Sequence, residues 1–596
     1  MRAPFRLLVT GISALLLAVA TWRMWSLHAA EQLWGWWPLP FLLGGWGLVV
    51  GLRQNPSRIK PLAIATVAGL GLGVGFAVGR VGILLFVGFA AMLLLVDELA
   101  ESDAPRRRMW WYGYHAMVVF NVTATWWVAN AALAAGVVAN FLNALLMTVP
   151  WVLTYAVRRR MPDVWLPAAV ALWIGFEYLH YNWQIAWPWL TLGNGFAGHE
   201  VFWYRYTGVF GGSLWVGLAG IGFFSLTRSR LRGERVPVRR LVGFFLVPVF
   251  APPLVSIVLA RLVLAADDAR PPGAVVRLVQ PNLEPHYEKF AVPDREQLAR
   301  FAELAAPDRG SGRPPHLVVF PETSFGSYDE ARLGGTPLAR MWRRTRKAYA
   351  AIGPEPPPDL LTGLSTHRRY DQRPDDPAVR TQADGRGGEL FYTAHNTAVS
   401  IVGDSIAGLY HKSRLVPGVE FLPYRRLLFF FEPLVDRLGG TLAGLGIDPA
   451  PQVFDYPSGI RAAPLICYES VYGDYVREYV RRGANLLVVP TNDGWWDDTP
   501  GYRQHFRFAG LRAVETNRYV VQAANSGISG VAKPTGYATP FLGYGEQEAV
   551  NVTVELLEGE TFYVRVGDLV GRVAAGASVL LLISLLARRL QRAGGT

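Results

Sequence analysis

The chain has 596 residues but a single cysteine, Cys467, and only 17% of its residues are charged. One thiol cannot form an intrachain disulfide, and it excludes a zinc or iron–sulfur site held by several cysteines. The scarcity of charge beside 51% hydrophobic residues excludes a disordered chain, which needs high charge and low hydrophobicity. Soluble proteins average about 25% charged residues, so this composition argues against a purely soluble enzyme.

Long apolar runs follow one another up to residue 265, and one more lies near the C-terminus. A membrane-spanning helix needs about 20 mostly apolar residues. The first run follows basic residues as in a signal peptide, but it lacks an obvious small-residue cleavage site, so we expect an anchor that stays in the membrane. Ten spans are predicted: 7–22, 33–52, 61–79, 81–97, 113–132, 134–156, 164–181, 208–226, 241–264 and 566–587.

The net charge of +12 is distributed unevenly between the loops that join these spans. If the N-terminus is cytoplasmic and the spans alternate, 20 lysine and arginine residues fall on the cytoplasmic side and three on the opposite side. This asymmetry follows the positive-inside rule, so the basic excess indicates membrane topology, and no nucleic-acid partner is predicted. Nine spans then place residues 266–565 outside the cytoplasm, and the tenth returns the C-terminus to it.

Residues 271–565 have the composition of an ordinary soluble domain. Short β-branched apolar runs predict buried strands, and amphipathic stretches between them predict helices, an alternation typical of a layered α/β core. The charged stretch 368–388, rich in Pro and Gly, is predicted as a surface insertion loop. The expected strands are 275–279, 317–320, 360–363, 397–402, 462–466, 486–489 and 519–523, and the expected helices are 294–306, 336–351, 470–482 and 502–517.

The cysteine lies where a predicted strand meets a predicted helix, in the sequence LICYES. A thiol at such a turn is close to a helix N-terminus, whose dipole favours the thiolate, and the backbone N–H of the next residue can help to hold an oxyanion. These features favour Cys467 as a catalytic nucleophile. Most free cysteines are small buried hydrophobic residues, and the local sequence around Cys467 leaves that alternative open.

Two further segments carry residues suited to catalysis. Glu322 ends a predicted buried strand, which is a common position for a catalytic carboxylate in α/β folds. Lys412 precedes a Pro-Gly turn that is followed by Glu420, and a lysine beside a thiol favours the thiolate and stabilises an oxyanion. Local sequence alone equally allows a solvated carboxylate and a surface lysine with an unrelated glutamate.

Together the three segments resemble a known pattern. A Glu that ends one strand, a Lys before a later turn and a Cys-Tyr-Glu elbow are similar to the Glu-Lys-Cys triad of the nitrilase superfamily. Such a domain after many spans, with one span behind it, resembles the apolipoprotein N-acyltransferase family over about residues 61–590. Supporting stretches that resemble family segments are 173–177, AWPWLTLG at 186–193, VQPN at 279–282, TNDGWW at 491–496, 504–515 and NSG at 525–527.

The resemblance implies a fold class: a polytopic α-helical membrane domain, an extracytoplasmic nitrilase-like αββα sandwich, and a C-terminal transmembrane helix. Residues 61–265 would form the membrane domain, 266–565 the catalytic domain, and 566–596 the last helix with a basic cytoplasmic tail. The family usually has seven spans before the catalytic domain, so residues 1–60 are interpreted as an extra helix pair. The family also often has a Trp after a Lys past the first strand, where this chain has Phe290.

By resemblance, the chain is an acyltransferase of the bacterial inner membrane, with its catalytic domain in the periplasm. Cys467 would take a fatty acyl chain from a phospholipid, expected to be phosphatidylethanolamine, as a thioester. It would pass this chain to the α-amine of the diacylglyceryl-cysteine of an apolipoprotein. Glu322 would be the general base, and Lys412 and the N–H of Tyr468 would stabilise the oxyanion.

Two acidic residues would support this set. Glu420 would position Lys412 or assist proton transfer, and Glu469 would orient the elbow. No cofactor is expected, and no His, Asp or Glu cluster at metal-ligand spacing in the sequence predicts a metal site. The enzyme is expected to act as a monomer.

Lipid contacts are expected at Trp495 and along the segment 424–431, YRRLLFFF. Arg425 would meet a phosphate, and Phe429 and Phe430 would dip into the membrane interface. An ordinary core helix is the alternative interpretation of this segment.

Two other functional classes stay open. A membrane-tethered carbon–nitrogen hydrolase would use water as the acceptor, and only the ten spans and the Trp-Pro-Trp segment favour the transferase over it. A transporter or scaffold with an inactive appended domain would carry ionisable residues deep in its spans, and Glu177 is one of few. The complete set of Glu322, Lys412 and Cys467 weighs against an inactive domain.

Overall fold

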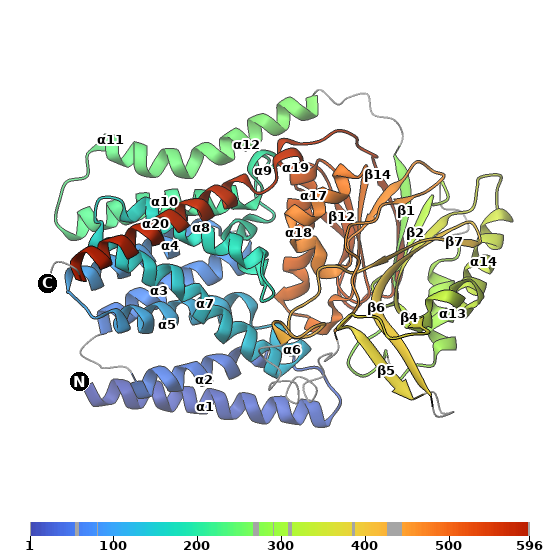
Figure 1. The fold of residues 1–596 in the computed structure, drawn as a ribbon, viewed down its shortest axis with the longest axis horizontal. Coiled ribbons are helices and arrows are strands. Elements are labelled where there is room, and N and C mark those ends of the chain that lie inside the picture. The colour runs from blue at the N-terminus through green and yellow to red at the C-terminus, as the bar shows by residue number, and fades with distance from the viewer. Residues whose placement is uncertain are drawn as a thin grey trace. The chain divides into compact units, whose positions relative to one another are not determined.

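The structure is a computed structural model that describes residues 2–53, 59–79, 81–265, 273–289, 291–307, 313–383, 388–425 and 444–593. It divides into two compact units (Figure 1). One unit contains Met1–Arg261, Thr499–Gln504 and Val566–Thr596 and is helical. The other contains Leu262–Asp498 and His505–Arg565 and holds the β-sheets.

Each of the ten predicted spans coincides with a helix of the first unit. Among the described residues, six helices are long and apolar enough to cross a membrane, namely α1, α3, α4, α7, α10 and α20. The bounds are α1 (Arg2–Ala29), α2 (Pro38–Arg53), α3 (Ile59–Val78), α4 (Ile83–Glu101), α5 (Arg106–Thr125), α6 (Val128–Ala131), α7 (Leu133–Arg160), α8 (Trp165–Tyr181), α9 (Tyr204–Thr207), α10 (Val209–Leu231), α11 (Val238–Leu241), α12 (Val247–Ala265) and α20 (Leu569–Ala593).

Glycines let α3 pack closely against both α4 and α5. A Cβ added at Gly71 would lie 2.9 Å from the Cα of Gly88 on α4. One added at Gly69 would lie 2.4 Å from the carbonyl oxygen of Ala116 on α5. Apolar helices in lipid associate through such close backbone contacts, because lipid supplies no hydrophobic force between them. The glycine-rich sequence of α3 therefore explains its central position among these three helices.

Ion pairs gather at the C-terminal end of α4. Asp97 is buried there and pairs with Arg158 of α7 at 2.9 Å and Arg228 of α10 at 2.7 Å. Lys60 of α3 pairs with Glu98 at 2.8 Å. The predicted topology assigned all three basic residues to one side of the membrane, and the structure places them at one end of the helical unit.

The second unit is a layered α/β fold, as the sequence predicts, with the αββα arrangement that the family resemblance implies (Figure 1). The first sheet has the order β14-β1-β2-β4-β6-β5, with β3 on β4 and β7 on β6, and the second has the order β13-β12-β11-β10-β9-β8. Helices α13 and α14 lie outside the first sheet, and α17 and α18 outside the second. Strands β1, β2 and β4 run parallel, as do β9, β10 and β11, so each group ends at one edge of its sheet.

The bounds of these strands are β1 (Ala274–Gln280), β2 (Leu317–Val319), β3 (Phe325–Asp329), β4 (Asp359–Tyr370), β5 (Val379–Ala383), β6 (Glu389–Val402), β7 (Ser405–His411), β8 (Phe454–Asp455), β9 (Arg461–Pro464), β10 (Leu486–Thr491), β11 (Tyr519–Ala524), β12 (Ser529–Ala532), β13 (Ala538–Leu542) and β14 (Glu548–Val554). The helices are α13 (Asp294–Leu304), α14 (Pro337–Ala350), α17 (Gly473–Arg481), α18 (Pro500–Thr516) and α19 (Phe562–Val566). All seven predicted strands and the predicted helices 294–306, 336–351 and 470–482 coincide with elements of this unit, and the predicted helix 502–517 coincides with α18, of which the part from His505 belongs to this unit.

The prediction of a loop over residues 368–388 is wrong. Strand β4 continues to Tyr370, and β5 pairs antiparallel with β6 from Val379 opposite Thr393 to Ala383 opposite Glu389. The charged composition suggested a loop because an exposed edge ribbon needs no apolar face, and charged side chains protect such edges. Pairing of β4 and β5 with β6, which local composition does not reveal, satisfies the backbone.

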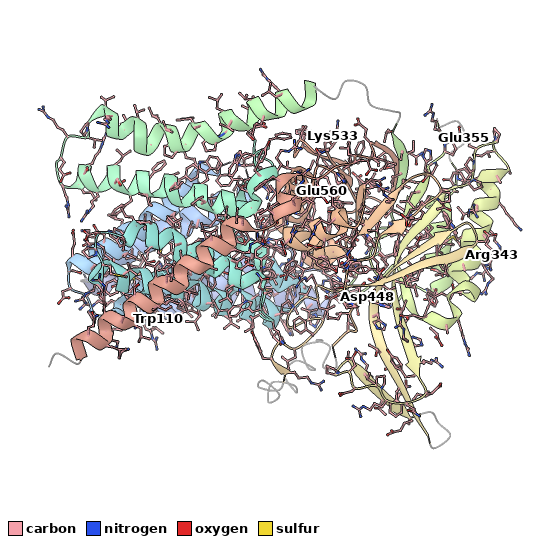
Figure 2. All side chains as sticks on the ribbon, turned by 45° about the horizontal axis from the view of Figure 1, so that its top comes forward. Trp110, Arg343, Glu355, Asp448, Lys533 and Glu560 are labelled. Carbon is pink, nitrogen blue, oxygen red and sulfur yellow. The ribbon has the colours of Figure 1, made fainter. Side chains whose placement is uncertain are left out.

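Aromatic side chains hold the turn after β2 at both of its ends. Phe320 and Phe325 contact the ring of Phe301, with ring centroids 4.8 and 4.6 Å apart. Phe320 also lies edge-on to Trp342 of α14 at 6.4 Å. Trp342 is fully buried, whereas its neighbour Arg343 lies at the surface (Figure 2). The amphipathic α14 thereby fixes the turn through its buried face.

We expect Trp342→Ala to destabilise this unit by about 3–5 kcal/mol, the usual loss when a buried large aromatic side chain is truncated. The indole nitrogen has no hydrogen-bond partner among the described residues, so the loss comes from packing. Thermal unfolding of the purified full-length protein in detergent measures it, with Ile352→Ala as the control because Ile352 is 57% exposed. Equal melting temperatures for the two variants would contradict this assignment of the core.

Candidate active site

Glu322 lies in the turn after β2 and is packed against β4. A Cβ added at Gly363 of β4 would lie only 2.6 Å from the Cα of Glu322. The N–H of Gly363 donates to the carbonyl of Pro321 at 3.1 Å, and Thr323 has a left-handed φ of 45°. The turn therefore packs directly on the backbone of Gly363, where a larger residue would clash. This contact fixes the position of the Glu322 side chain.

Three groups from separate segments contact the Glu322 carboxylate, which is buried. Its Oε1 accepts hydrogen bonds from Nδ2 of Asn396 at 2.7 Å and from Nζ of Lys412 at 3.2 Å. Its Oε2 accepts one from the backbone N–H of Asn492 at 3.2 Å. Burial acts to raise the pKa of Glu322, but the Lys412 ammonium and the Asn396 hydrogen bond outweigh it and lower the pKa. Glu322 is therefore ionised at neutral pH, as a general base must be.

Lys412 directly follows β7 and is 1% exposed. Its Nζ donates to Glu322 and also to Oε1 of Glu420 at 2.9 Å. Burial opposes the ammonium charge, but Glu322 and Glu420 together raise the pKa of Lys412 well above its ordinary value. Glu420 is held in turn by the N–H of Val416, which donates to Oε2 at 2.8 Å. The fold thus brings Glu322, Lys412 and Glu420 into one hydrogen-bonded group.

Cys467 begins the short 3-10 helix η7 (Cys467–Val471), shortly after β9. Its φ of 49° is rare for a residue with a side chain, and such strain is typical of functional sites. Burial and the nearby Glu322 carboxylate raise the pKa of the thiol well above its ordinary value, while the Lys412 ammonium acts in the opposite direction. The thiol therefore keeps its proton at rest and needs a base when it attacks.

A buried network holds the backbone of the cysteine. The Oγ of Ser470 donates to the carbonyl of Cys467 at 2.7 Å, and Nε2 of His505 lies 2.9 Å from that Oγ and 3.2 Å from the same carbonyl. The other ring nitrogen of His505 lies 2.9 Å from Oδ1 of Asp493. Burial acts to lower the pKa of His505, but Asp493 outweighs it and raises the pKa. The sequence analysis assigned none of these three residues to this role.

Glu469 links the elbow to the lysine segment. Its Oε1 accepts from the N–H of Ser413 at 2.8 Å and from the hydroxyl of Tyr410 at 2.5 Å, and its Oε2 accepts from the N–H of Ile466 at 2.9 Å. Burial raises the pKa of Glu469 to about 7 despite these hydrogen bonds. Tyr468, between the cysteine and Glu469, is also buried.

The structure describes two of the predicted lipid contacts, Trp495 and Arg425. The ring of Trp495 is edge-on to that of His286, with centroids 5.1 Å apart. Arg425 is exposed and donates from Nη1 to the carbonyl of Pro377 at 3.4 Å. Three residues discussed from the sequence lie outside the described ones: Phe290, Phe429 and Phe430.

Three polar residues at the Glu322 turn were assigned no role from the sequence: Asn396, Asn492 and Lys289. Both asparagines border predicted strands, and a polar residue at the end of an apolar strand is the signal that could have indicated them. Lys289 donates from Nζ to Oγ1 of Thr323 at 2.9 Å. Burial lowers the pKa of Lys289 to about 8, although Glu322 opposes this shift.

We expect the Cys467 thiol to react slowly with the neutral reagent iodoacetamide at about pH 8, because its raised pKa leaves little thiolate. Iodoacetamide reacts with the thiolate already present and does not need Glu322 as a base. In Glu322→Gln the loss of the carboxylate charge lowers the thiol pKa and increases that thiolate, so alkylation accelerates on the order of tenfold. In Lys412→Met the loss of the ammonium slows it. Intact mass measured over time gives the rates, and Cys467→Ala gives the background. Equal rates in the wild type and both variants would contradict the closeness of the three groups.

Two protein-family models match the chain. The model of the apolipoprotein N-acyltransferase N-terminal domain matches residues 68–222, and the carbon-nitrogen hydrolase model matches residues 297–556. Together they cover more than two thirds of the chain. A solved structure of a variant of a Nesterenkonia amidase from the nitrilase superfamily is 19% identical, with a TM-score of 0.31, and covers 50% of this chain and 95% of the amidase chain.

Curated relatives match over nearly the whole chain. The apolipoprotein N-acyltransferase of Chlorobaculum tepidum is 29% identical over 558 residues, which cover 90% of this chain and 99% of the relative. That of Gloeobacter violaceus is 28% identical and covers 89% of this chain and 96% of the relative. These matches confirm the resemblance found from the sequence. The chain belongs to the apolipoprotein N-acyltransferase family.

Proposed function

We propose that this chain transfers a fatty acyl chain from a phospholipid to the N-terminal α-amine of the diacylglyceryl-cysteine of apolipoproteins, through a thioester on Cys467. Its family membership supports lipoprotein N-acylation. The observation that carries the finer proposal is the contact of Glu322 with Lys412, whose charges both act on the thiol of Cys467. Such a set can take a thiol proton and hold an oxyanion, as acyl transfer requires.

In the first half-reaction, the sulfur of Cys467 attacks the ester carbonyl of the phospholipid while Glu322 takes the thiol proton. The ammonium of Lys412 and the N–H of Tyr468 stabilise the tetrahedral oxyanion. Collapse of this intermediate breaks the ester C–O bond, and Glu322 returns the proton to the leaving oxygen. A lysophospholipid departs, and the acyl chain remains on sulfur as a thioester.

In the second half-reaction, the α-amine of the apolipoprotein attacks the thioester carbonyl. Glu322 takes the amine proton, the C–S bond breaks, and the proton passes to the leaving thiolate of Cys467. The product is an amide, and the enzyme returns to its starting state. Glu420 positions Lys412 in both steps, and Glu469 holds the elbow.

We further propose phosphatidylethanolamine as the donor and a monomer as the functional unit. The proposed lipid contacts are Trp495, Arg425, Phe429 and Phe430.

The proposed location is the bacterial inner membrane, with both termini in the cytoplasm and the catalytic domain, residues 266–565, in the periplasm. The gathering of Lys60, Arg158 and Arg228 at one end of the helical unit supports this topology. In this proposal residues 1–60 are an added helix pair, 61–265 the membrane domain and 566–596 the last helix with its basic tail.

The direct test is the intact mass of the purified protein after incubation with phosphatidylethanolamine, beside Cys467→Ser. We expect one acyl chain on the wild type and none on the variant. A diacylglyceryl-cysteine peptide should then discharge the adduct. Discharge by water alone at the same rate would instead identify a hydrolase, and the absence of an adduct on folded protein would overturn the thioester proposal.

We expect acyl transfer to weaken as the pH falls through about 7, because Glu469 then takes a proton. Its ionised form accepts from Ser413 and Ile466, whereas the protonated form sets an O–H donor against one of these N–H donors. The pH profile of kcat/KM measures the effect. In Glu469→Gln, activity should be low at about pH 8 and the acid limb should flatten. A variant profile that keeps the wild-type acid limb would assign that limb to another group.

A further inference from the structure

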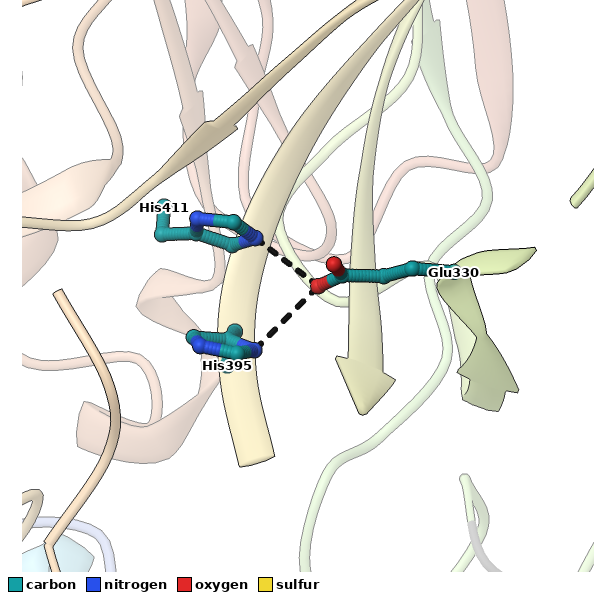
Figure 3. Close-up of side chains that lie close together, drawn as sticks. All are labelled: Glu330, His395 and His411. Atoms are coloured by element: carbon teal, nitrogen blue, oxygen red, sulfur yellow. Dashed lines mark hydrogen bonds and ion pairs between the residues drawn. The ribbon is translucent and has the colours of Figure 1, made fainter. Parts of the chain in front are cut away.

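Glu330, His395 and His411 converge on one point of the α/β unit (Figure 3). The Oε1 of Glu330 lies 2.8 Å from Nε2 of His411 and 3.2 Å from Nδ1 of His395. The side chains of all three are at least nine-tenths buried. The three ligand atoms lie within 4.8 Å of one another. The residues are far apart in the sequence, which is why their spacing predicts no metal site.

Two imidazoles share one carboxylate oxygen in this cluster. The Nδ1 of His395 is buried and lies in an ion-pair contact with Oε1 of Glu330, and among the described residues it has no further partner. Two ring nitrogens that converge on one carboxylate oxygen present three ligand atoms to a single ion. A tetrahedral zinc ion with bonds of about 2.0–2.1 Å separates its ligand atoms by about 3.4 Å. The separation at His395 fits this value, and that at His411 would widen by about half an ångström.

The surroundings of His411 match those of a metal ligand. Its Nδ1 lies 2.9 Å from Oδ1 of Asp448, and its backbone N–H donates to Oδ2 of the same residue at 2.9 Å. Metal-binding histidines usually give their outer N–H to a carboxylate, which fixes the ring and leaves the inner nitrogen for the metal. At Glu330, Nε of Arg368 donates to Oε2 at 2.9 Å, so Oε1 is the oxygen that faces the two histidines. Oε1 also accepts a hydrogen bond from Oγ1 of Thr366 at 2.9 Å.

We propose that Glu330, His395 and His411 bind one divalent transition-metal ion, with zinc the best match to two imidazoles and one carboxylate. Each ligand lies on a segment that also carries a residue of the candidate active site. His395 precedes Asn396, His411 precedes Lys412, and Glu330 follows the Glu322 turn through β3. Successive residues of a strand point to opposite faces, so the ion would sit behind the active site. It would hold β6, the end of β7 and the segment after β3 in fixed relative positions. The role of the ion in positioning the active-site residues rests on the proposed function.

The metal site is tested on the full-length protein in detergent, without any acyl-transfer assay. The protein is stripped with a chelator, dialysed and titrated with Zn²⁺, and bound metal is measured by mass spectrometry. Co²⁺ in place of Zn²⁺ reports the ligand set through its visible absorption bands. We expect about one ion per chain for the wild type. Glu330→Gln and His395→Ala should lose this ion, and Asp448→Asn should weaken binding by about 10–100-fold as a second-layer change.

The matched control is His367→Ala, since His367 lies on β4 beside Thr366 but contacts Ser327 instead of the cluster. It should keep the wild-type stoichiometry. If Glu330→Gln or His395→Ala fails to fold, the Zn²⁺ and Co²⁺ titrations of the wild type decide alone. A wild type that takes up no Zn²⁺, or no more than the two ligand variants, overturns the metal site and leaves the cluster as hydrogen-bonded histidines. Since no acyl transfer is measured, either result is independent of the proposed function.

Discussion

The buried ion pair of Glu322 and Lys412 is the interaction around which the candidate active site is arranged. Burying a single charge costs several kcal/mol, and the cost is offset only when the partner charge and further hydrogen bonds are well placed. Here Asn396, Asn492 and Glu420 complete the set. Because these groups come from β6, from the segment after β10 and from the loop after β7, the pair needs both sheets in register.

Local backbone constraints then place the cysteine relative to that pair. Gly363 allows the Glu322 turn to press against β4, and the left-handed Cys467 is held by Ser470 and His505 through its carbonyl oxygen. A strained residue persists only where its surroundings determine it fully. The buried hydrogen bonds from Ser470 and His505 hold the backbone of Cys467 in this conformation, although a residue with a side chain does not prefer it.

The two faces of β6 and β7 carry different chemistry. Asn396 and Lys412 point to Glu322, while their neighbours His395 and His411 meet at Glu330 on the other face. Alternation along a strand makes this arrangement possible with adjacent residues. A change at either face therefore acts on the other through the backbone that they share.

The sequence by itself predicted the helices of the first unit, six of which are long and apolar enough to cross a membrane among the described residues, the seven central strands, and the candidates Glu322, Lys412 and Cys467. Hydropathy and residue period are local properties, and the family motifs are contiguous. Only the tertiary structure decided that residues 368–370 and 379–383 belong to strands, that Asn396 and Asn492 meet Glu322, and that Glu330, His395 and His411 converge. The contacts of Glu322 and Glu330 join segments that are distant in the chain, and no local pattern of charge or hydrophobicity encodes which distant segment becomes a neighbour.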